Sequence, residues 1–468
     1  LDSISRDQEI PVSYAQQRIW LLHQIYGGSA HYNMPAALKL TGTVNEDAFQ
    51  HAFTSILERH ESLRTYFVAD GNGEPLQVIQ AVTPFHIPLV DLSAMEEGER
   101  QLQLAERVAE EFGRVFDLSA DLMLRAQLIK VANDEHIVLV NMHHIASDGW
   151  SMSILINEFS SLYAAYVQGK TNPLSPLPIQ YADYAHWQRY WLQGDVLDQQ
   201  MGYWTQQLSG LPVVHSLPLD HARPPLQSFV GTTYGSLIDA ETNKSLNQLC
   251  QSQGATLFMG LHAAFSVLLS RYSNETDIVV GSPIANREQA EIAGLIGFFV
   301  NTLVLRSDLS NNPSFTSLLN QSKTMLLDAY AHQQVPFEQI VERLQPERSL
   351  RHSALFQILL VLQNNEQGIL ELPGLTLSPV EQSGAGIAKY DITLSITESE
   401  QGLYLGWEYN SDLFEQDTIA RMANHFALLL NALVKTPNEN VFKVEMLNPE
   451  DRHQLLIDWN NTQADYPS

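Results

Sequence analysis

The first part of the chain alternates between helix-like and strand-like patterns of apolar residues. In residues 45–61 apolar side chains recur every three or four positions, which predicts an amphipathic helix with Asn45 as its N-cap. Residues 63–68 are rich in aromatic and β-branched side chains, as is typical of a strand. Residues 136–142 form a nearly continuous apolar run, which predicts a strand covered on both faces, and another helix is expected directly after Asp148.

The same succession restarts after two proline-containing stretches. Residues 168–180 and 210–226 carry several prolines and are predicted to be crossovers or domain boundaries. Beyond them, residues 258–269 have one apolar helical face and lead into a strand-like segment at residues 276–286. The pattern therefore predicts an α/β protein in which two lobes each offer a helix followed by a strand.

We place the division between the lobes near residue 175. The N-terminal lobe is expected to span residues 1–175 and the C-terminal lobe residues 176–451. The polar stretch at 452–468 is predicted to begin a linker to a following domain, and the absence of an initiator methionine at Leu1 suggests a piece of a longer protein.

Charge and cysteine content narrow the classes of partner. Against 26 basic residues the chain has 53 acidic ones, a net charge of −27, which repels nucleic acid and anionic membrane surfaces. Cys250 is the single cysteine and cannot form an internal disulfide, so a reducing compartment such as the cytoplasm is expected. No apolar run approaches membrane-spanning length, and the first residues lack a signal-peptide pattern.

The most specific chemical feature is the run from His143 to Gly149, HHIASDG, at the junction of the predicted strand and helix. Neighbouring side chains on an extended backbone point to opposite faces, so His143 and His144 are expected to have different roles. A neutral imidazole with an ordinary pKa of about 6.5 can accept a proton from an attacking amine or hydroxyl. Asp148 would either orient this histidine or pair with an arginine, and Gly149 would allow a tight turn into the helix.

Two other interpretations of this run are weaker. In the first, both histidines are core residues whose imidazoles bond to backbone groups. In the second they form a metal site, but adjacent histidines on a strand cannot chelate one metal ion. The chain has no GxSxG, GxxxxGK[ST] or GxGxxG motif, which removes the usual support for an acyl-serine, a phosphate loop or a dinucleotide site. A base at a strand end without a protein nucleophile favours direct transfer between two bound substrates.

With HHxxxDG at 143–149, the sequence resembles a condensation domain of a nonribosomal peptide synthetase, in the chloramphenicol acetyltransferase-like superfamily. The resemblance covers nearly the whole chain, because further family motifs follow in family order: SYAQQRIW at 13–20, RHESLRTYF at 59–67, YADYAHW at 181–187, GFFVNT at 297–302, HQQVPFE at 332–338 and RSLRHSALFQ at 348–357. Three positions depart from the family pattern, namely His186, Gln334 and Ala354, and the last of these stands where proline is frequent in the family.

The resemblance implies two acetyltransferase-like lobes in a V around a central tunnel. Donor and acceptor groups would arrive as thioesters on the 4'-phosphopantetheine arms of carrier proteins, and the acceptor α-amine would attack the donor carbonyl. His144 is the histidine that the family places at the reacting centre. Asp148 is expected to pair with an arginine, either Arg64 or Arg59, while Asn301 supports the site and the backbone of Gly149 lines it.

The implied partners are donor and acceptor carrier proteins and a downstream adenylation domain, with no bound cofactor and no metal. The opening SYAQQRIWLL resembles domains that join an L donor to an L acceptor, although starter and dual epimerising domains share much of it. An inactive carrier-recruiting scaffold would usually have a broken HHxxxDG. An epimerisation domain would carry tryptophan at the position of Met152, and a heterocyclising relative would replace both histidines by aspartate.

Overall fold

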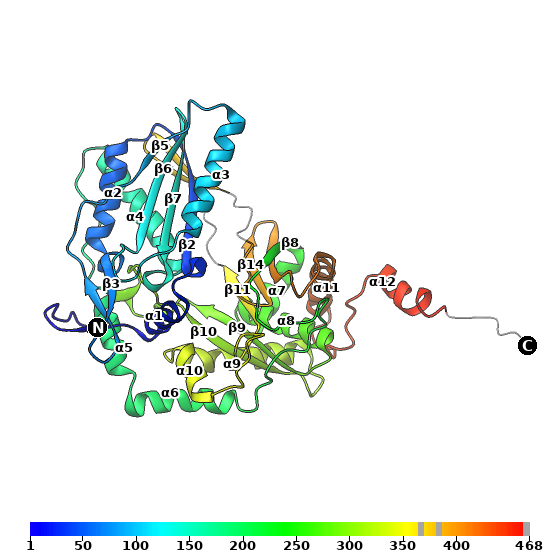
Figure 1. The fold of residues 1–468 in the computed structure, drawn as a ribbon. Helices are drawn as coiled ribbons and strands as arrows, with labels where there is room; N and C mark the ends of the chain where they lie inside the picture. Colours follow the sequence, from blue (N-terminus) through cyan, green and yellow to red (C-terminus); the bar gives the residue numbers. More distant parts are fainter. Residues whose placement is uncertain (364–368, 381–385, 462–468) are drawn as a thin grey trace, which may run out of the picture.

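The computed structural model describes residues 1–363, 369–380 and 386–461. Two six-stranded mixed sheets form the centres of two lobes, which stand at an angle to one another (Figure 1). A small three-stranded antiparallel sheet, ordered β1-β4-β3, flanks the N-terminal lobe. The prediction of an α/β protein with two lobes is therefore confirmed.

The N-terminal sheet has the strand order β12-β13-β2-β7-β6-β5. Its strands, with those of the small sheet, are β1 (Ile10–Pro11), β2 (Asn33–Gly42), β3 (Thr65–Ala69), β4 (Pro75–Ile79), β5 (Leu89–Asp91), β6 (Leu124–Ala132), β7 (Glu135–His143), β12 (Leu370–Leu372) and β13 (Leu375–Pro379). The helices of this lobe are α1 (Tyr14–Tyr26), α2 (Glu46–Arg59), α3 (Glu97–Gly113) and α4 (Gly149–Val167).

Helices cover both faces of the N-terminal sheet. On one face α2 and α4 pack together over β7, with Phe49, Phe53 and Phe159 in their shared core. On the other face α3 covers the outward side chains of β6 and β7. The central strand β7 is consequently buried along almost its whole length, as its apolar run predicted. Asn45 caps α2 by accepting a hydrogen bond from the backbone N–H of Ala48, at 3.0 Å.

The C-terminal sheet has the strand order β10-β9-β11-β14-β15-β8. Its strands are β8 (Gly231–Asp239), β9 (Asp277–Ile284), β10 (Asn301–Asp308), β11 (Ile358–Gln363), β14 (Ile392–Ser399) and β15 (Gly402–Asn410). The remaining helices are α5 (Tyr181–Trp191), α6 (Gly194–Gln207), α7 (Ala240–Ser252), α8 (Leu257–Ser273), α9 (Phe315–Ala331), α10 (Phe337–Leu344), α11 (Gln416–Lys435) and α12 (Pro449–His453). Helices α7, α8, α9 and α11 pack on this sheet around one large core.

The chain crosses between the lobes more often than a single division at residue 175 implies. Strands β12 and β13 lie in the range assigned to the C-terminal lobe, but β13 pairs antiparallel with β2 and so completes the N-terminal sheet. Helix α5 follows the predicted boundary and still packs against β1 of the N-terminal lobe. The two-lobe division therefore needs these corrections, because backbone pairing across lobes leaves no local pattern in the sequence.

The structure also bears on the predicted C-terminal linker and on the prediction that no segment spans a membrane. The predicted linker at 452–468 begins within α12, and residues 462–468 of it lie outside the described residues. Among the described helices none alone is long and apolar enough to cross a membrane, although the bent pair α7 and α8 meets the length and composition requirement together.

Candidate active site

The HHxxxDG run lies where the sequence placed it, between a buried strand and a helix. Strand β7 ends at His143, a single 3₁₀ turn spans His144–Ala146, and α4 begins at Gly149. Asp148 is the N-cap of α4, accepting from the backbone N–H of Ser151 at 2.9 Å. The two histidines face different surroundings, as the alternation of side chains at a strand end predicts.

His143 belongs to the core of the N-terminal lobe. Its Nδ1 accepts a hydrogen bond from the backbone N–H of Ile145 at 3.0 Å, and its ring meets the ring of Phe116 edge-on, with centroids 5.5 Å apart. Burial lowers the pKa of His143 to about 3, so the imidazole is neutral at physiological pH. These contacts make His143 a structural residue that holds the turn bearing His144.

His144 is the partly exposed histidine of the pair. Its Nδ1 lies 2.7 Å from the carbonyl oxygen of Ser147, and because a carbonyl only accepts, Nδ1 must carry the hydrogen. Burial lowers the pKa of His144 below its ordinary value, and the positive charge of Lys389 acts in the same direction. The imidazole is therefore neutral near pH 7 with its lone pair on Nε2, which receives no hydrogen bond from the described residues.

Asp148 links the two lobes through a fully buried carboxylate. Its Oδ1 accepts from Arg287 Nη2 at 3.1 Å, and its Oδ2 accepts from the backbone N–H groups of Phe299 and Val300 at 3.0 and 3.1 Å. The side chains of Arg287 and Asp148 are 4% and 0% exposed. An arginine does pair with Asp148 as expected, but it is Arg287 from the C-terminal lobe.

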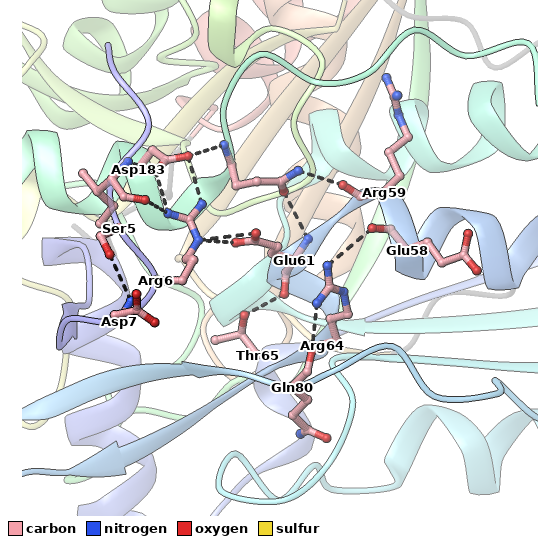
Figure 2. Close-up of polar contacts among 12 residues, drawn as sticks. Ser5, Arg6, Asp7, Glu58, Arg59, Glu61, Arg64, Thr65, Gln80 and Asp183 are labelled. Carbon is pink, nitrogen blue, oxygen red and sulfur yellow. Dashed lines mark hydrogen bonds and ion pairs between the residues drawn. The ribbon is translucent and has the colours of Figure 1, made fainter.

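The two arginines that the sequence suggested for this pairing act elsewhere, which corrects that prediction. Arg64 donates to the backbone carbonyls of Leu57 and Gln80 at 2.9 and 2.8 Å, and so satisfies the end of α2. Figure 2 shows its bonds to Gln80 and to the carbonyl of Glu58. Arg59 pairs with Glu158 of α4 at 2.6 Å. Both stabilise the N-terminal lobe around the site and do not contact the HHxxxDG run.

Gly149 is not required by the backbone. It is the first residue of α4, its φ lies outside the left-handed region, and a Cβ added there would meet nothing within 4 Å. Gly149 was expected to allow a tight turn into the helix, but its backbone does not use the left-handed conformation that favours glycine. The open space beside Gly149 instead leaves room next to the turn that carries His144.

Residues of the first motif contact the turn that carries His144. The side chain of Gln16, in the first turn of α1, donates to the carbonyl oxygen of Ile145 at 3.1 Å. Trp20 packs in the same small core as Ile145 and Ala146. The first motif thus serves the turn through one buried hydrogen bond and one aromatic contact, roles that its sequence alone did not assign.

Asn301 supports the site by fixing a neighbouring loop. Its Nδ2 donates to the carbonyl oxygens of Gln333 and Val335, both at 2.9 Å, and its Oδ1 accepts from the backbone N–H of Phe337 at 2.9 Å. This buried amide therefore ties the HQQVPFE motif and the start of α10 to the first residue of β10.

We expect Asn301→Ala to lower the free energy of unfolding by about 1–3 kcal/mol, because three buried backbone groups lose their partner. Chemical denaturation of both proteins measures this change. Asn440→Ala, which removes an amide whose Oδ1 accepts from the nearby N–H of Phe442, is the control and should cost less. An Asn301 variant as stable as the wild type would contradict this role.

Arg287 was not among the residues predicted from the sequence, although a signal for it existed. Arg287 directly follows the predicted strand at 276–286, the strand-like segment of the second lobe. It donates from Nη1 to the carbonyls of Ile292 and Leu295 and lies over the ring of Phe299, 4.4 Å from its centroid. A search for arginines at ends of strands in both lobes would have included it.

Two of the departures from the family pattern, Ala354 and His186, have a described local geometry. At Ala354 the following residue, Leu355, adopts a φ of +70°, and the N–H of Phe356 bonds the carbonyl of Ala354 at 2.9 Å. His186 stacks on Tyr190 at the surface of α5. Within the described residues, no group of three or more His, Cys, Asp or Glu side chains is arranged to hold a metal ion.

Comparisons with known proteins identify the family. The family model described as Condensation domain matches residues 6–456. A protein of the linear gramicidin synthase of Brevibacillus parabrevis is 42% identical over 464 residues, which cover 99% of this chain and 6% of that protein. Malpinin synthetase of Mortierella alpina is 43% identical over 459 residues, covering 98% of this chain and 6% of that protein. The chain thus spans a small part of these relatives.

Solved structures give the same fold. The X-domain in a complex with OxyB from teicoplanin biosynthesis superposes with a TM-score of 0.85 at 28% identity, covering 96% of this chain and 98% of that one. A four-domain nonribosomal peptide synthetase, holo-AB3403, bound to AMP and glycine, matches with a TM-score of 0.82 over 95% of this chain and 34% of its own, and at 23% identity it shows the fold alone. The predicted pair of acetyltransferase-like lobes is confirmed. The chain belongs to the condensation domain family, whose members in nonribosomal peptide synthetases catalyse amide bond formation.

Proposed function

We propose that this chain joins a donor aminoacyl or peptidyl thioester to the α-amine of an acceptor aminoacyl thioester, both held on phosphopantetheine arms of carrier proteins. The amine nitrogen forms a bond to the donor carbonyl carbon, the C–S bond breaks, and the donor arm leaves as a thiol that takes up the amine proton. The observation that carries this proposal is the neutral His144, fixed by Ser147 with the lone pair of Nε2 free of any partner among the described residues.

The share of His144 in the reaction follows from the two pKa values involved. An α-amine with a pKa of about 8 is partly neutral near pH 7, so the demand on a base is modest. Holding two reactants in attack geometry can contribute roughly 7–11 kcal/mol. We therefore assign His144 mainly to positioning the amine, by accepting its N–H at Nε2, with proton transfer as the smaller share.

The residues around His144 have supporting roles in the proposed reaction. Asp148 and Arg287 hold the turn against the C-terminal lobe. His143 holds it against the N-terminal lobe. Gly149 leaves space in which the thioester group would lie, and Arg59, Arg64 and Asn301 support the surrounding elements.

We also propose the partner proteins and the cellular compartment of this chain. Donor and acceptor carrier proteins would reach His144 from opposite ends of a tunnel between the lobes, and an adenylation domain would follow the linker. We assign no bound cofactor, metal, nucleic acid or membrane partner, in keeping with the net charge of −27 and the absence of phosphate-loop and ligand motifs. The expected compartment is the cytoplasm.

An inactive scaffold of the same fold is the alternative class. The X-domain, which has this fold, forms a complex with OxyB in teicoplanin biosynthesis. In the present chain the motif is intact and His144 is partly exposed, which favours an enzyme. Starter and dual epimerising domains remain alternatives within the enzymatic class.

The stereochemical subtype gives a direct test. Because SYAQQRIWLL resembles domains that join two L residues, we expect an L-loaded donor carrier to react faster than the D-loaded donor, with an L,L dipeptide as product. Chiral analysis of the dipeptide from each donor enantiomer measures this. Faster transfer from the D-loaded donor, or a D residue in the product from an L-loaded donor, would reject the subtype, and no dipeptide from either donor would reject condensation itself.

A further inference from the structure

We propose that Phe298 is a positioning residue for His144, presented from the opposite lobe by the segment 296–300. This inference rests on the proposed function, because it assigns the aromatic ring a role only if His144 acts at the reacting centre. Seen in the sequence alone, Phe298 is more typical of a core aromatic. In the structure Phe298 is partly buried at the edge of the small core that contains Ile145 and Ala146, and it also meets the ring of His144.

The two rings are in contact and share an exposed side. The centroids of His144 and Phe298 lie 4.4 Å apart with an interplanar angle of 54°, and both residues are partly exposed. The hydrogen bond from Nδ1 to Ser147 fixes one point of the imidazole but still lets the ring rock about that point. The phenyl ring packs against the imidazole and blocks that motion, so the direction of the Nε2 lone pair is set by contacts from two lobes.

The segment 296–300 is itself held unusually firmly at its backbone. The carbonyl oxygen of Ile296 accepts a hydrogen bond from the hydroxyl of Ser62 at 2.7 Å, and the N–H of Ile296 donates to Nδ1 of His60 at 3.4 Å. The N–H of Gly297 donates to Oγ of Ser151 at 3.0 Å. The N–H groups of Phe299 and Val300 donate to Asp148. Four of the five residues in the segment are therefore bonded through their backbone to side chains of the N-terminal lobe.

Helix α5 closes the remaining side of the segment. Tyr181 donates its hydroxyl to the carbonyl oxygen of Phe298 at 2.7 Å. A Cβ added at Gly297 would lie 2.3 Å from the ring of Tyr181, so only glycine fits between them. With its backbone bonded on both sides and no room for displacement, the segment can hold the Phe298 ring at a fixed place against His144.

The next residue provides a matched control. Phe299 is buried on the other side of the segment, where it packs against Tyr181 and Tyr184 and under the guanidinium of Arg287. The rings of Phe298 and Phe299 therefore have different neighbours, and only Phe298 is in ring contact with His144. Equal truncations of Phe298 and Phe299 therefore separate the contact with His144 from the general stability of the segment.

Removing the Phe298 ring should also change the titration of His144. The phenyl group keeps water from one face of the imidazole, and a hydrated imidazole stabilises its charged form, so the pKa of His144 rises toward its ordinary value. The charged or titratable groups that face His144 are His143 and Asp148 from its own segment and Lys389 from the segment before β14, and none of these changes in the variant. The acid limb of the rate profile is therefore expected to move to higher pH.

The test compares single-turnover dipeptide formation by wild type, Phe298→Leu, Phe298→Tyr and Phe299→Leu between pH 5.5 and 8.5, with thermal unfolding recorded for each. We expect Phe298→Leu to lower the rate roughly ten- to hundredfold, as loss of a held geometry does, and to shift the acid limb upward. Phe298→Tyr keeps the aromatic ring and should retain most of the wild-type rate. Phe299→Leu should lower the melting temperature without moving the acid limb.

Two outcomes would overturn the inference. One is an unchanged rate and acid limb in Phe298→Leu, and the other is an equal shift in Phe299→Leu, which would assign the effect to the stability of the segment. Both require an active wild-type protein. If the wild type itself forms no dipeptide, the proposed function fails first, and the two failures are thereby distinguished.

Discussion

Replacing His144 by alanine should lower the rate of peptide transfer roughly 10²-fold or more, because the attacking amine loses the acceptor that positions it and the smaller contribution of proton transfer is lost as well. The reason is geometric, because the Nε2 atom has no hydrogen-bond partner within the described part of the chain, while Nδ1 is bound to Ser147. The fold should survive, since the side chain is partly exposed and its one hydrogen bond joins residues of the same turn. Single-turnover kinetics and circular dichroism of the purified variant measure both parts of this expectation.

His143→Ala is the matched control, one residue away in the same motif. It removes the acceptor for the N–H of Ile145 and leaves a cavity against Phe116, so we expect the free energy of unfolding to fall by about 1–3 kcal/mol. The rate of peptide transfer by His143→Ala should fall only in proportion to the fraction of the protein that is unfolded. Near wild-type transfer by His144→Ala, or a larger rate loss in a well-folded His143→Ala, would contradict the division of roles.

Asp148→Asn should destabilise the protein by about 3–5 kcal/mol, the cost of leaving a buried charge without its partner. Arg287 would keep its positive charge at a site where its side chain is 4% exposed. An amide also cannot accept on both sides, so its NH₂ group would face either the N–H groups of Phe299 and Val300 or the guanidinium. Denaturant unfolding followed by tryptophan fluorescence gives the change.

A double variant separates the ion pair from the other bonds of Asp148. Adding Arg287→Met to Asp148→Asn removes the unpaired charge, so the double variant should be more stable than the sum of the two single changes predicts, with a coupling of about 1–3 kcal/mol. Strict additivity of the two changes would show that Asp148 and Arg287 do not interact energetically, and would reject the pairing.

Local features of the active site could be predicted from the sequence because they depend on neighbouring residues. The strand at 136–142, the helix after Asp148 and the opposite surroundings of His143 and His144 follow from periodicity and from the alternation of side chains. Asn45 as the cap of α2 follows from capping chemistry in the same way.

Long-range features could not be predicted in this way. Arg287 lies 139 residues from its partner Asp148, and any of several buried arginines could have filled that place from charge alone. Arg64 was suggested because it stands in a family motif near the site, yet a guanidinium is equally suited to bind helix-end carbonyls, and α2 supplies them. The addition of β13 to the N-terminal sheet depends on backbone pairing with β2, which no side-chain pattern records.

The proposed reaction moves a donor acyl group onto an acceptor amine. Intact-protein mass spectrometry of the acceptor carrier protein, after mixing with the loaded donor carrier and the purified domain, measures this transfer. We expect the acceptor carrier to gain the mass of the donor aminoacyl group while the donor arm becomes a free thiol, and His144→Ala to slow both changes greatly. An acceptor carrier that keeps its original mass, with both thioesters intact in the presence of folded wild-type domain, would show that the chain does not catalyse condensation.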